Sequence, residues 1–187
     1  TVTVTAVGGQ SPYSGEGTFS VGAGTHTYTV TDDDGCTNSA SITISPAPAH
    51  SGTKWYVNDN SLTGDVFTSA LGNAGNSGTA ACPFATIAQA IAACVAGDTI
   101  YADAGTYNEN VAINKALTLI GSGPATTILT PTVACTGDGI SISVANVNVS
   151  NLTVTGFNYG IRTSASTISL YNVESNSNCL YGLNTST

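Results

Sequence analysis

Apolar and polar residues alternate with a period of two through residues 1–45, in short runs separated by turns. The runs are TVTVTAV, GTFSVGAG, THTYTVT and SASITIS, and the stretches between them, such as GGQSPYSGEG and DDDG, are rich in Gly, Pro or Asp. Alternation of this kind predicts strands with one face toward a core. We therefore expect a small β-sandwich, incomplete at its N-terminus because about 45 residues is short for this fold.

The pattern changes after the stretch SPAPAHSGTK. Its prolines and small residues predict a stiff linker over residues 46–54. KWYVND then predicts a strand, and residues 60–81, rich in Gly, Asn, Ser and Ala, predict a long surface loop. The second domain is expected over residues 55–187.

One segment, PFATIAQAIAACVAGD, has the period of a helix. Thr86 is suited to the N-cap position, and Gly97 to the end of the helix. The expected apolar face consists of Ile87, Ala90, Ile91, Cys94 and Val95. A single helix followed only by strands is typical of a cap laid over the open end of a stack of strands.

A repeat of about 21 residues runs through the last third of the chain. Gly139-Ile140 recurs as Gly160-Ile161 and as Gly182-Leu183, and VNVSNLTV (147–154) aligns with ISLYNVES (168–175). The period predicts a right-handed parallel β-helix, in which coils of three short strands stack with rungs ~4.8 Å apart. The fold class is thus all-β: a partial Ig-like sandwich followed by a right-handed parallel β-helix with one N-terminal capping helix.

The last repeat stops at GLNTST, inside a coil that matches GIRTS. A coil stack that ends there exposes an unpaired, partly apolar edge. We therefore expect further domains of the same chain, or self-association, to cover it. Because the sequence also lacks an initiator Met and opens inside a strand pattern, we interpret it as a piece of a longer secreted protein.

Charge is scarce, and this narrows the range of partners. Only 7% of residues are charged, the net charge is −8, and Lys54, Lys115 and Arg162 are the only cationic side chains. Phosphate contacts require clustered Lys and Arg, so we exclude nucleic acid as a partner. No stretch approaches the ~20 apolar residues of a membrane span, so we expect no membrane insertion.

Five cysteines are spread along the chain without a C-x-x-C pair, which favours disulfides over metal ligation. Cys135 and Cys179 fall two coils apart, ~9.6 Å by the rung spacing, beyond the ~7 Å Cα limit for a disulfide, unless the loop TPTVACTGDG bends across. We favour Cys82–Cys94 over a bridge from either of them to Cys135.

The segment PFATIAQAIAACVAGDTIYADAGTYNENVAINKALTLIGSG (83–123) closely resembles the entry segment of pectate-lyase-like right-handed β-helix proteins. Their pattern of P-F-x-T-I-x-x-A-I, G-D-T-I, G-T-Y-x-E-x-V and K-x-L-T-L-x-G is matched from Pro83 to Gly121. With the repeats, the resemblance extends over residues 55–187. It implies the fold, whereas the family contains lyases, esterases and non-enzymatic surface proteins.

Residues 1–45 resemble the Ig-like repeats of large secreted adhesins such as those of gliding Bacteroidetes, on the elements GGQSPY, GTHTYTVTDDDGC and SASITI. In such repeats the cysteine of the D-x-x-G-C turn, here Cys36, pairs with an earlier cysteine. The resemblance therefore implies an upstream partner for Cys36, which leaves Cys82, Cys94, Cys135 and Cys179 to pair among themselves.

Catalytic chemistry has few candidates. A polysaccharide lyase needs a base beside a cation or metal, and Lys115 with Arg162 is the one pair available. A hydrolase needs convergent carboxylates, but the acidic residues of the β-helix part are scattered: Asp98, Asp103, Glu109, Asp138 and Glu174. We expect Lys115 to be a structural turn residue and expect no catalytic site in these coils.

Binding chemistry has two weaker candidates. Asp32, Asp33 and Asp34 form the only acidic run and could hold Ca²⁺, the single cofactor candidate, although DDDG is also an ordinary hairpin turn. Tyr159, Tyr171 and Tyr181 fall on successive coils and could stack on a sugar chain, or equally fill the stack. For Trp55 and Tyr56 we favour a place in the core.

These observations favour a non-catalytic structural or adhesive segment of a large secreted or cell-surface bacterial protein, such as part of a filament or stalk. Two alternatives remain. One is a lyase-like carbohydrate-active enzyme with its site on other coils, and the other is a carbohydrate-binding module for a surface polysaccharide.

Overall fold

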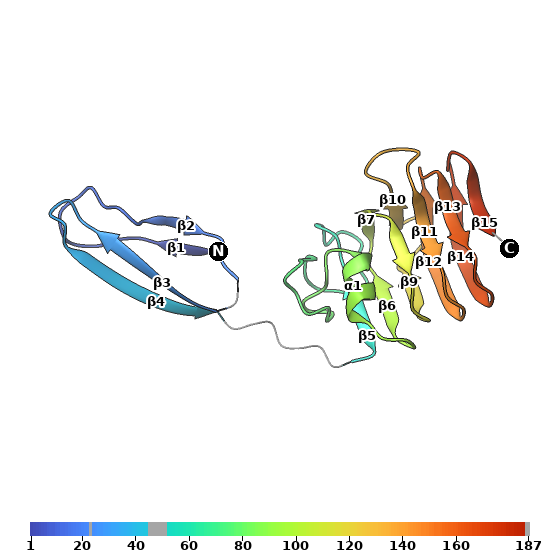
Figure 1. The fold of residues 1–187 in the computed structure, drawn as a ribbon, viewed down its shortest axis with the longest axis horizontal. Helices are drawn as coiled ribbons and strands as arrows, with labels where there is room; N and C mark the ends of the chain where they lie inside the picture. Colours follow the sequence, from blue (N-terminus) through green and yellow to red (C-terminus); the bar gives the residue numbers. More distant parts are fainter. Residues whose placement is uncertain (23, 45–51, 186–187) are drawn as a thin grey trace. The chain divides into compact units, whose positions relative to one another are not determined.

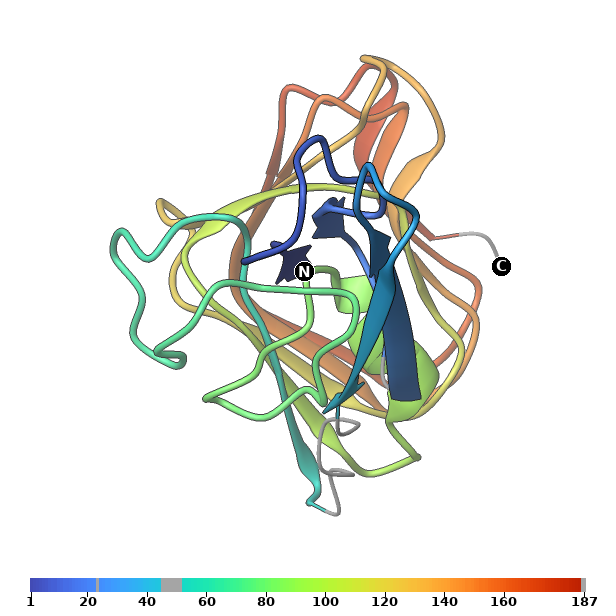
Figure 2. The same ribbon diagram turned by 90° about the vertical axis from the view of Figure 1, so that its left-hand side faces the viewer.

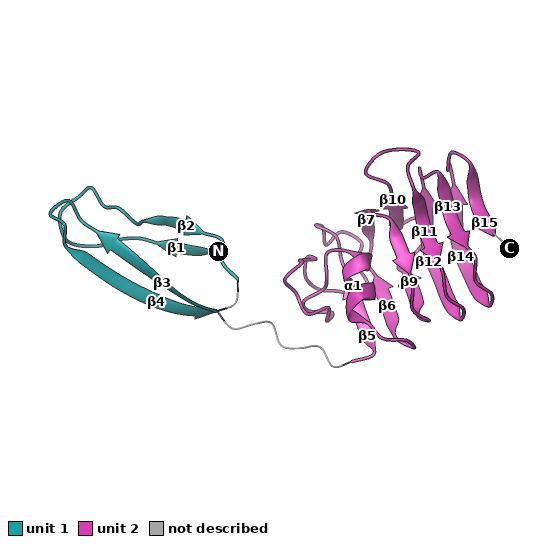
Figure 3. Cartoon of the chain, viewed as in Figure 1, with its two compact units in different colours: residues 1–48 teal, residues 49–187 magenta. Residues whose placement is uncertain are grey.

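The computed structural model describes residues 1–22, 24–44 and 52–185. Over these described residues the protein is nearly all β, with 46% of residues in strands and one helix. It divides into two compact units, Thr1–Pro48 and Ala49–Thr187 (Figure 3). Most of the predicted linker, residues 46–51, lies outside the described residues.

The first unit contains two antiparallel ribbons. Strand β1 (Val2–Val4) pairs with β2 (Gly17–Phe19), and β3 (Gly24–Thr31) pairs with β4 (Thr37–Ile44) through the DDDG turn. Hydroxyl pairs such as Thr27–Ser41, 2.8 Å apart, join β3 and β4 across the ribbon. The four predicted strands are therefore confirmed, whereas the Ig-like sandwich stays a prediction.

The second unit is a parallel β-solenoid of about four turns (Figure 1). Viewed along the stack, the successive coils overlie one another (Figure 2). Its strands are β5 (Lys54–Val57), β6 (Thr99–Ala102), β7 (Gly105–Asn108), β8 (Val111–Ile113), β9 (Thr118–Gly121), β10 (Thr127–Thr130), β11 (Asp138–Ile142), β12 (Val147–Thr155), β13 (Tyr159–Thr163), β14 (Ile168–Asn176) and β15 (Tyr181–Thr185).

These strands form three faces. The first face contains β5, β6, β9 and the first halves of β12 and β14. The second contains β7, β10 and the second halves of β12 and β14. The third contains β8, β11, β13 and β15. All of these pairs are parallel, as the predicted β-helix requires.

The repeat seen in the sequence is the register of the coils. Ile140 pairs with Ile161, and Ile161 with Leu183. The glycines that precede them have no room for a side chain, because a Cβ at Gly160 would lie only 2.7 Å from the backbone oxygen of Gly182. The alignment of 147–154 with 168–175 is likewise the observed pairing of β12 with β14.

The corners of the coils repeat in the same way. Asn151 and Asn172, which stack 21 residues apart, have φ of 57° and 53°, a left-handed conformation that Asn tolerates better than most residues. Asn172 Nδ2 donates to Asn151 Oδ1 at 2.8 Å, so one corner supports the next. These asparagines bend β12 and β14 from the first face to the second.

Apolar side chains fill the interior of the solenoid. The largest side chains with less than 2% exposure are Phe157, Ile87, Ile100, Ile113, Leu119, Ile140, Leu152 and Ile161. The last coil differs: Leu183 is 52% exposed although its neighbour Ile161 is buried, and Leu170 is 37% exposed beside buried Val149. The expected apolar edge is therefore present on β14 and β15.

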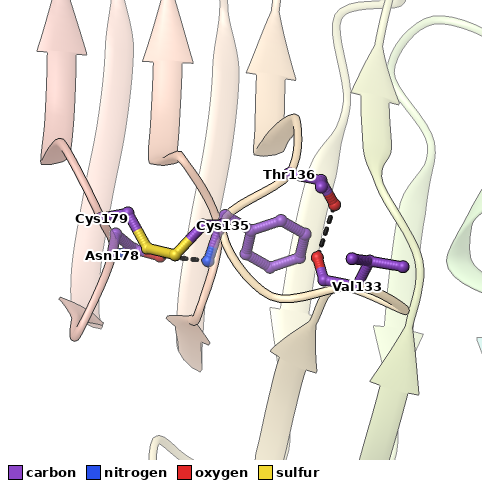
Figure 4. Close-up of a disulfide and its surroundings, with 6 residues drawn as sticks. Val133, Cys135, Thr136, Asn178 and Cys179 are labelled. Carbon is purple, nitrogen blue, oxygen red and sulfur yellow. Dashed lines mark hydrogen bonds between the residues drawn. A yellow bond between two sulfur atoms is a disulfide. The ribbon is translucent and has the colours of Figure 1, made fainter.

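A disulfide joins Cys135 and Cys179, whose Cα atoms are 5.5 Å apart (Figure 4). Cys135 N donates to Gly156 O and Cys179 N to Phe157 O, so both cysteines lie against the same intervening turn. The β10–β11 loop thus bends across one coil, and the rung spacing does not apply to it.

The favoured bridge, Cys82–Cys94, is wrong. Both thiols are free, and Cys94 is buried among apolar residues of the core. The thiol of Cys36 is also free and exposed, and an upstream partner for it stays a prediction.

Removal of the Cys135–Cys179 bridge should loosen the last two coils. The bond closes a loop of 44 residues, for which the chain-entropy estimate of stabilisation is about 4 kcal/mol. We expect Cys135→Ser with Cys179→Ser to lower the free energy of unfolding by roughly 2–4 kcal/mol in chemical denaturation. Cys36→Ser is the matched control, and an equal loss from it would contradict a structural role for the bridge.

Candidate functional site

The helix α1 (Ile87–Ala93) lies at the N-terminal end of the solenoid and packs against β5, β6 and β8 (Figure 1). Thr86 is its N-cap, as predicted, and accepts a hydrogen bond from Gln89 N at 3.2 Å. Two expectations are wrong: the helix ends before Cys94 rather than at Gly97, and Val95 is 65% exposed. Gly97 lies beyond the helix and donates its N–H to Ala116 O.

Two charged side chains from the first coil hold the two ends of α1. The Glu109 carboxylate, between β7 and β8, accepts hydrogen bonds from Ile87 N at 2.8 Å and Ala88 N at 3.0 Å. The Lys115 ammonium, between β8 and β9, donates to the carbonyls of Ile91, Ala92 and Cys94 at 2.7, 3.1 and 2.7 Å. A negative charge at the N-terminus and a positive one at the C-terminus both favour the helix dipole.

Lys115 therefore has the structural role expected of it, and this role is to bind the C-terminal end of α1. All three of its N–H groups have backbone acceptors, and it is part-buried against the helix. Arg162, the other cation of the candidate lyase pair, lies on β13 and pairs with Asp138. The structure thus gives the two cations different partners on different elements.

Asp103 organises the long loop before the helix. Its side chain is fully buried and accepts hydrogen bonds from the backbone N–H groups of four residues, at 2.7–3.0 Å, and from the Thr68 hydroxyl; the four residues are Val66, Phe67, Thr68 and Ala104. Through these five hydrogen bonds the Asp103 carboxylate holds the loop against the start of β7. The sequence indicated only that Asp103 belongs to the entry pattern.

Asp98 is also buried, with 4% exposure, and accepts hydrogen bonds from Trp55 Nε1 and Val95 N, both at 2.8 Å. Trp55 is 9% exposed and stacks on Phe84, which confirms the core role expected for it. Tyr56 stacks on Tyr101. Three carboxylates of the entry segment, Asp98, Asp103 and Glu109, are therefore held by backbone or indole N–H groups.

A polar network that the sequence did not indicate lies under the same loop. Buried Asn58 donates to Asp65 Oδ2 at 2.7 Å and to Ala70 O at 2.9 Å. Burial, together with the nearby charges of Asp103 and Asp59, raises the pKa of the Asp65 carboxyl. Within the described residues no group of three or more His, Cys, Asp or Glu is arranged to hold a metal ion.

The predicted tyrosine ladder is divided between two faces. Tyr159 on β13 and Tyr181 on β15 are register partners, and their rings stack with centroids 6.0 Å apart. Tyr171 lies on β14 and pairs with Ser150, on the first face, where it is 73% exposed. The structure thus brings together two of the three rings.

Charged groups flank the stacked tyrosines. The Arg162 guanidinium lies 5.5 Å from the centre of the Tyr159 ring, and its Nη1 is 3.6 Å from Asp138 Oδ2. Tyr181 is 58% exposed and the Arg162 side chain 49%. We call Asp138, Tyr159, Arg162 and Tyr181 the aromatic ledge. It offers a flat π-face, guanidinium donors and a carboxylate acceptor on one surface.

The calcium candidate serves the turn in which it lies. Asp32 accepts hydrogen bonds from Cys36 N at 2.8 Å and Gln10 N at 3.3 Å, while Asp33 and Asp34 are exposed. An aspartate at the start of a turn commonly accepts such hydrogen bonds from backbone N–H groups in place of a backbone carbonyl. Calcium binding here stays a prediction.

A family model described as a protein of unknown function, DUF1565, matches residues 70–121. The family is linked to β-helix proteins. The match covers the last part of the loop before the helix, the helix α1 and the strands β6 to β9. A comparison with curated proteins finds no match to the chain. The one described helix is too short to cross a membrane.

Loss of the Lys115 ammonium should destabilise the capped end. Lys115→Met leaves three carbonyls without their charged donor, and we expect a loss of roughly 1.5–3 kcal/mol in the free energy of unfolding. Trp55, the only tryptophan, reports on the same end by fluorescence. Lys54→Met, at an exposed lysine, is the control and should cost less than about 0.5 kcal/mol. Equal effects would refute the capping role.

Glu109 should give the protein a distinct pH dependence. Burial raises the pKa of its carboxyl, and the hydrogen bonds from Ala88 and Ile87 only partly offset this. The folded state therefore binds its proton more tightly than the unfolded state, whose pKa is 4.5. The contribution of this group to stability is complete below pH 4.5 and is lost as the pH rises to the folded pKa.

The measurement is the free energy of unfolding of the unmodified chain minus that of Glu109→Gln, followed from pH 3.5 upward. We expect this difference to fall as the pH rises above 4.5 and then to level off. A difference that grows with pH would mean that the helix N–H groups outweigh burial.

Proposed function

We propose that the chain is a non-catalytic structural and adhesive segment of a larger secreted or cell-surface protein. The observation that carries this proposal is the use made of the ionisable residues in the segment that matches the family model. Asp98, Asp103, Glu109 and Lys115 all bind backbone or indole groups of the cap. An acid–base catalyst needs a proton-transfer group that faces a substrate.

The extracellular setting is supported by two features. The Cys135–Cys179 disulfide is of the kind that persists in oxidising compartments. A surface of Thr, Ser and Asn with 7% charged residues is compatible with a display module that has few ionic partners. We extend the proposal to the right-handed, pectate-lyase-like form of the solenoid, since parallel crossovers are almost always right-handed, and to the Ig-like nature of residues 1–45.

Carbohydrate binding at the aromatic ledge is a second candidate function. Tyr181 offers an exposed ring to the apolar face of a sugar, and Tyr159 supports it from behind by stacking. The paired Asp138 and Arg162 can accept and donate hydrogen bonds to hydroxyl groups. Because the pair is neutral and the chain carries a net charge of −8, the ledge suits an uncharged polysaccharide better than a uronate polymer.

Two assays separate these functions. The chain should not increase the absorbance of unsaturated products from uronate polymers, with or without added Ca²⁺. If it does, and Lys115→Met or Arg162→Gln lowers the rate a hundredfold, the non-catalytic proposal is wrong.

For the ledge, immobilised neutral and uronate polysaccharides are compared as ligands. Binding should fall at least fivefold in Tyr181→Ala and stay unchanged in Tyr171→Ala, the matched control on the other face. Equal losses in both variants, or no binding to any neutral polymer, would remove the second candidate.

A further inference from the structure

The Cys135–Cys179 disulfide joins the two segments that lead into the aromatic ledge. Cys135 lies three residues before Asp138, the first residue of β11, and Cys179 lies two residues before Tyr181, the first residue of β15. Asp138 and Tyr181 are both register partners of Tyr159, the first residue of β13. The bond therefore connects the entrances of the two strands that flank β13 on the third face.

The turn at residues 156–158, which leads into β13, supports both cysteines. Cys135 N donates to Gly156 O at 2.7 Å, and Cys179 N donates to Phe157 O at 2.8 Å. The disulfide thus spans this turn and holds the segments on either side against it (Figure 4). All three strands that carry the ledge begin directly after these contacts.

The loop that contains Cys135 has few other contacts to hold it. Residues 132–136 are all exposed. Within the described part of the chain, their one hydrogen bond to another segment is that from Cys135 N to Gly156 O, while the Thr136 hydroxyl donates to Val133 O inside the loop. Cys135 also has a φ of 61°, in the left-handed region that is uncommon for residues other than Gly, Asn or Asp. The covalent bond is therefore the main constraint on the loop.

We propose that the Cys135–Cys179 bond is a redox clasp for the aromatic ledge: a dithiol opens it in the folded protein, and the ledge then loses its order. A thiolate of the dithiol attacks the exposed Cys135 Sγ, and Cys179 leaves as a thiolate that takes up a proton. The second thiol of the reagent then displaces Cys135, which is protonated in turn. The protein gains two thiols, and the dithiol is oxidised to a disulfide.

Opening of the clasp changes the ledge because its groups come from three strands. The Tyr159 and Tyr181 rings stack with centroids 6.0 Å apart, and Arg162 lies 3.6 Å from Asp138. Movement at the start of β11 or β15 separates these pairs and removes the flat surface. The consequence for ligands rests on the carbohydrate binding proposed above, whereas the opening of the bond and the disorder of the ledge do not.

The first test follows the bond and the fold together in the whole chain carrying Cys36→Ser, which removes the exposed free thiol. The protein is treated with dithiothreitol without denaturant, and new thiols are alkylated and located by peptide mapping. We expect Cys135 and Cys179 to be alkylated while the fluorescence of Trp55, at the other end of the solenoid, stays unchanged. A bond that opens only when this fluorescence reports unfolding would overturn the proposal.

Amide hydrogen exchange of the same reduced sample tests the effect on the ledge. We expect faster exchange in residues 132–141 and 177–184 and unchanged exchange in β6 and β9. Reduction that leaves exchange at the starts of β11 and β15 unchanged would show that the bond does not order the ledge, and would also overturn the proposal.

Binding to an immobilised neutral polysaccharide then tests the consequence. Reduction should weaken binding at least threefold, and reoxidation should restore it. Cys135→Ser with Cys179→Ser is the matched control, whose weaker binding dithiothreitol should leave unchanged. Equal binding before and after reduction would contradict control of the ledge by the clasp. If the unreduced chain binds no neutral polysaccharide, the carbohydrate function fails, and the exchange result alone decides for or against the clasp.

Discussion

Every coil of a parallel solenoid relies on its neighbours for backbone hydrogen bonds and for cover over its apolar interior. The requirement fails at the ends, and the rest of this structure depends on how the N-terminal end is closed. There the helix α1 and the preceding loop are held by side chains from the first coil: Asp103 binds the loop, while Glu109 and Lys115 bind the two ends of the helix. All but one of these hydrogen bonds, that from the Thr68 hydroxyl, join a side chain of the first coil to the backbone.

This closure also decides how the charged residues are interpreted. A chain with three cations and eleven acidic residues has few groups for catalysis, and those in the family-matched segment maintain the cap. In the last described coil, by contrast, Leu170 and Leu183 are partly exposed.

Periodicity was sufficient to predict the solenoid, because stacked coils repeat the same inward positions. The pairing of Ile140, Ile161 and Leu183 could be read from the 21-residue spacing. Three features could not be predicted from the sequence spacing. The long-range hydrogen bonds of Asp103 and Lys115 join residues 21–37 positions apart, and no sequence repeat relates these positions. The Cys135–Cys179 bridge depends on a loop that leaves the coil path. The aromatic ledge could be identified only once each strand was assigned to a face. From the sequence spacing alone, Tyr171 was grouped with Tyr159 and Tyr181, although it lies on another face.

The central claim is that the family-matched segment is a structural cap, and amide hydrogen exchange of Asp103→Asn tests it most directly. In the unmodified protein the backbone N–H groups of the loop donate to both oxygens of the Asp103 carboxylate. In the variant one oxygen is replaced by an amide N–H₂, which cannot accept hydrogen bonds. We expect faster exchange in residues 58–72 and in β5 and β6, and unchanged exchange in β12 and β13. Native exchange in the loop and the first coil of this variant would contradict the account, because it would show that the end of the solenoid is closed by something other than these ties.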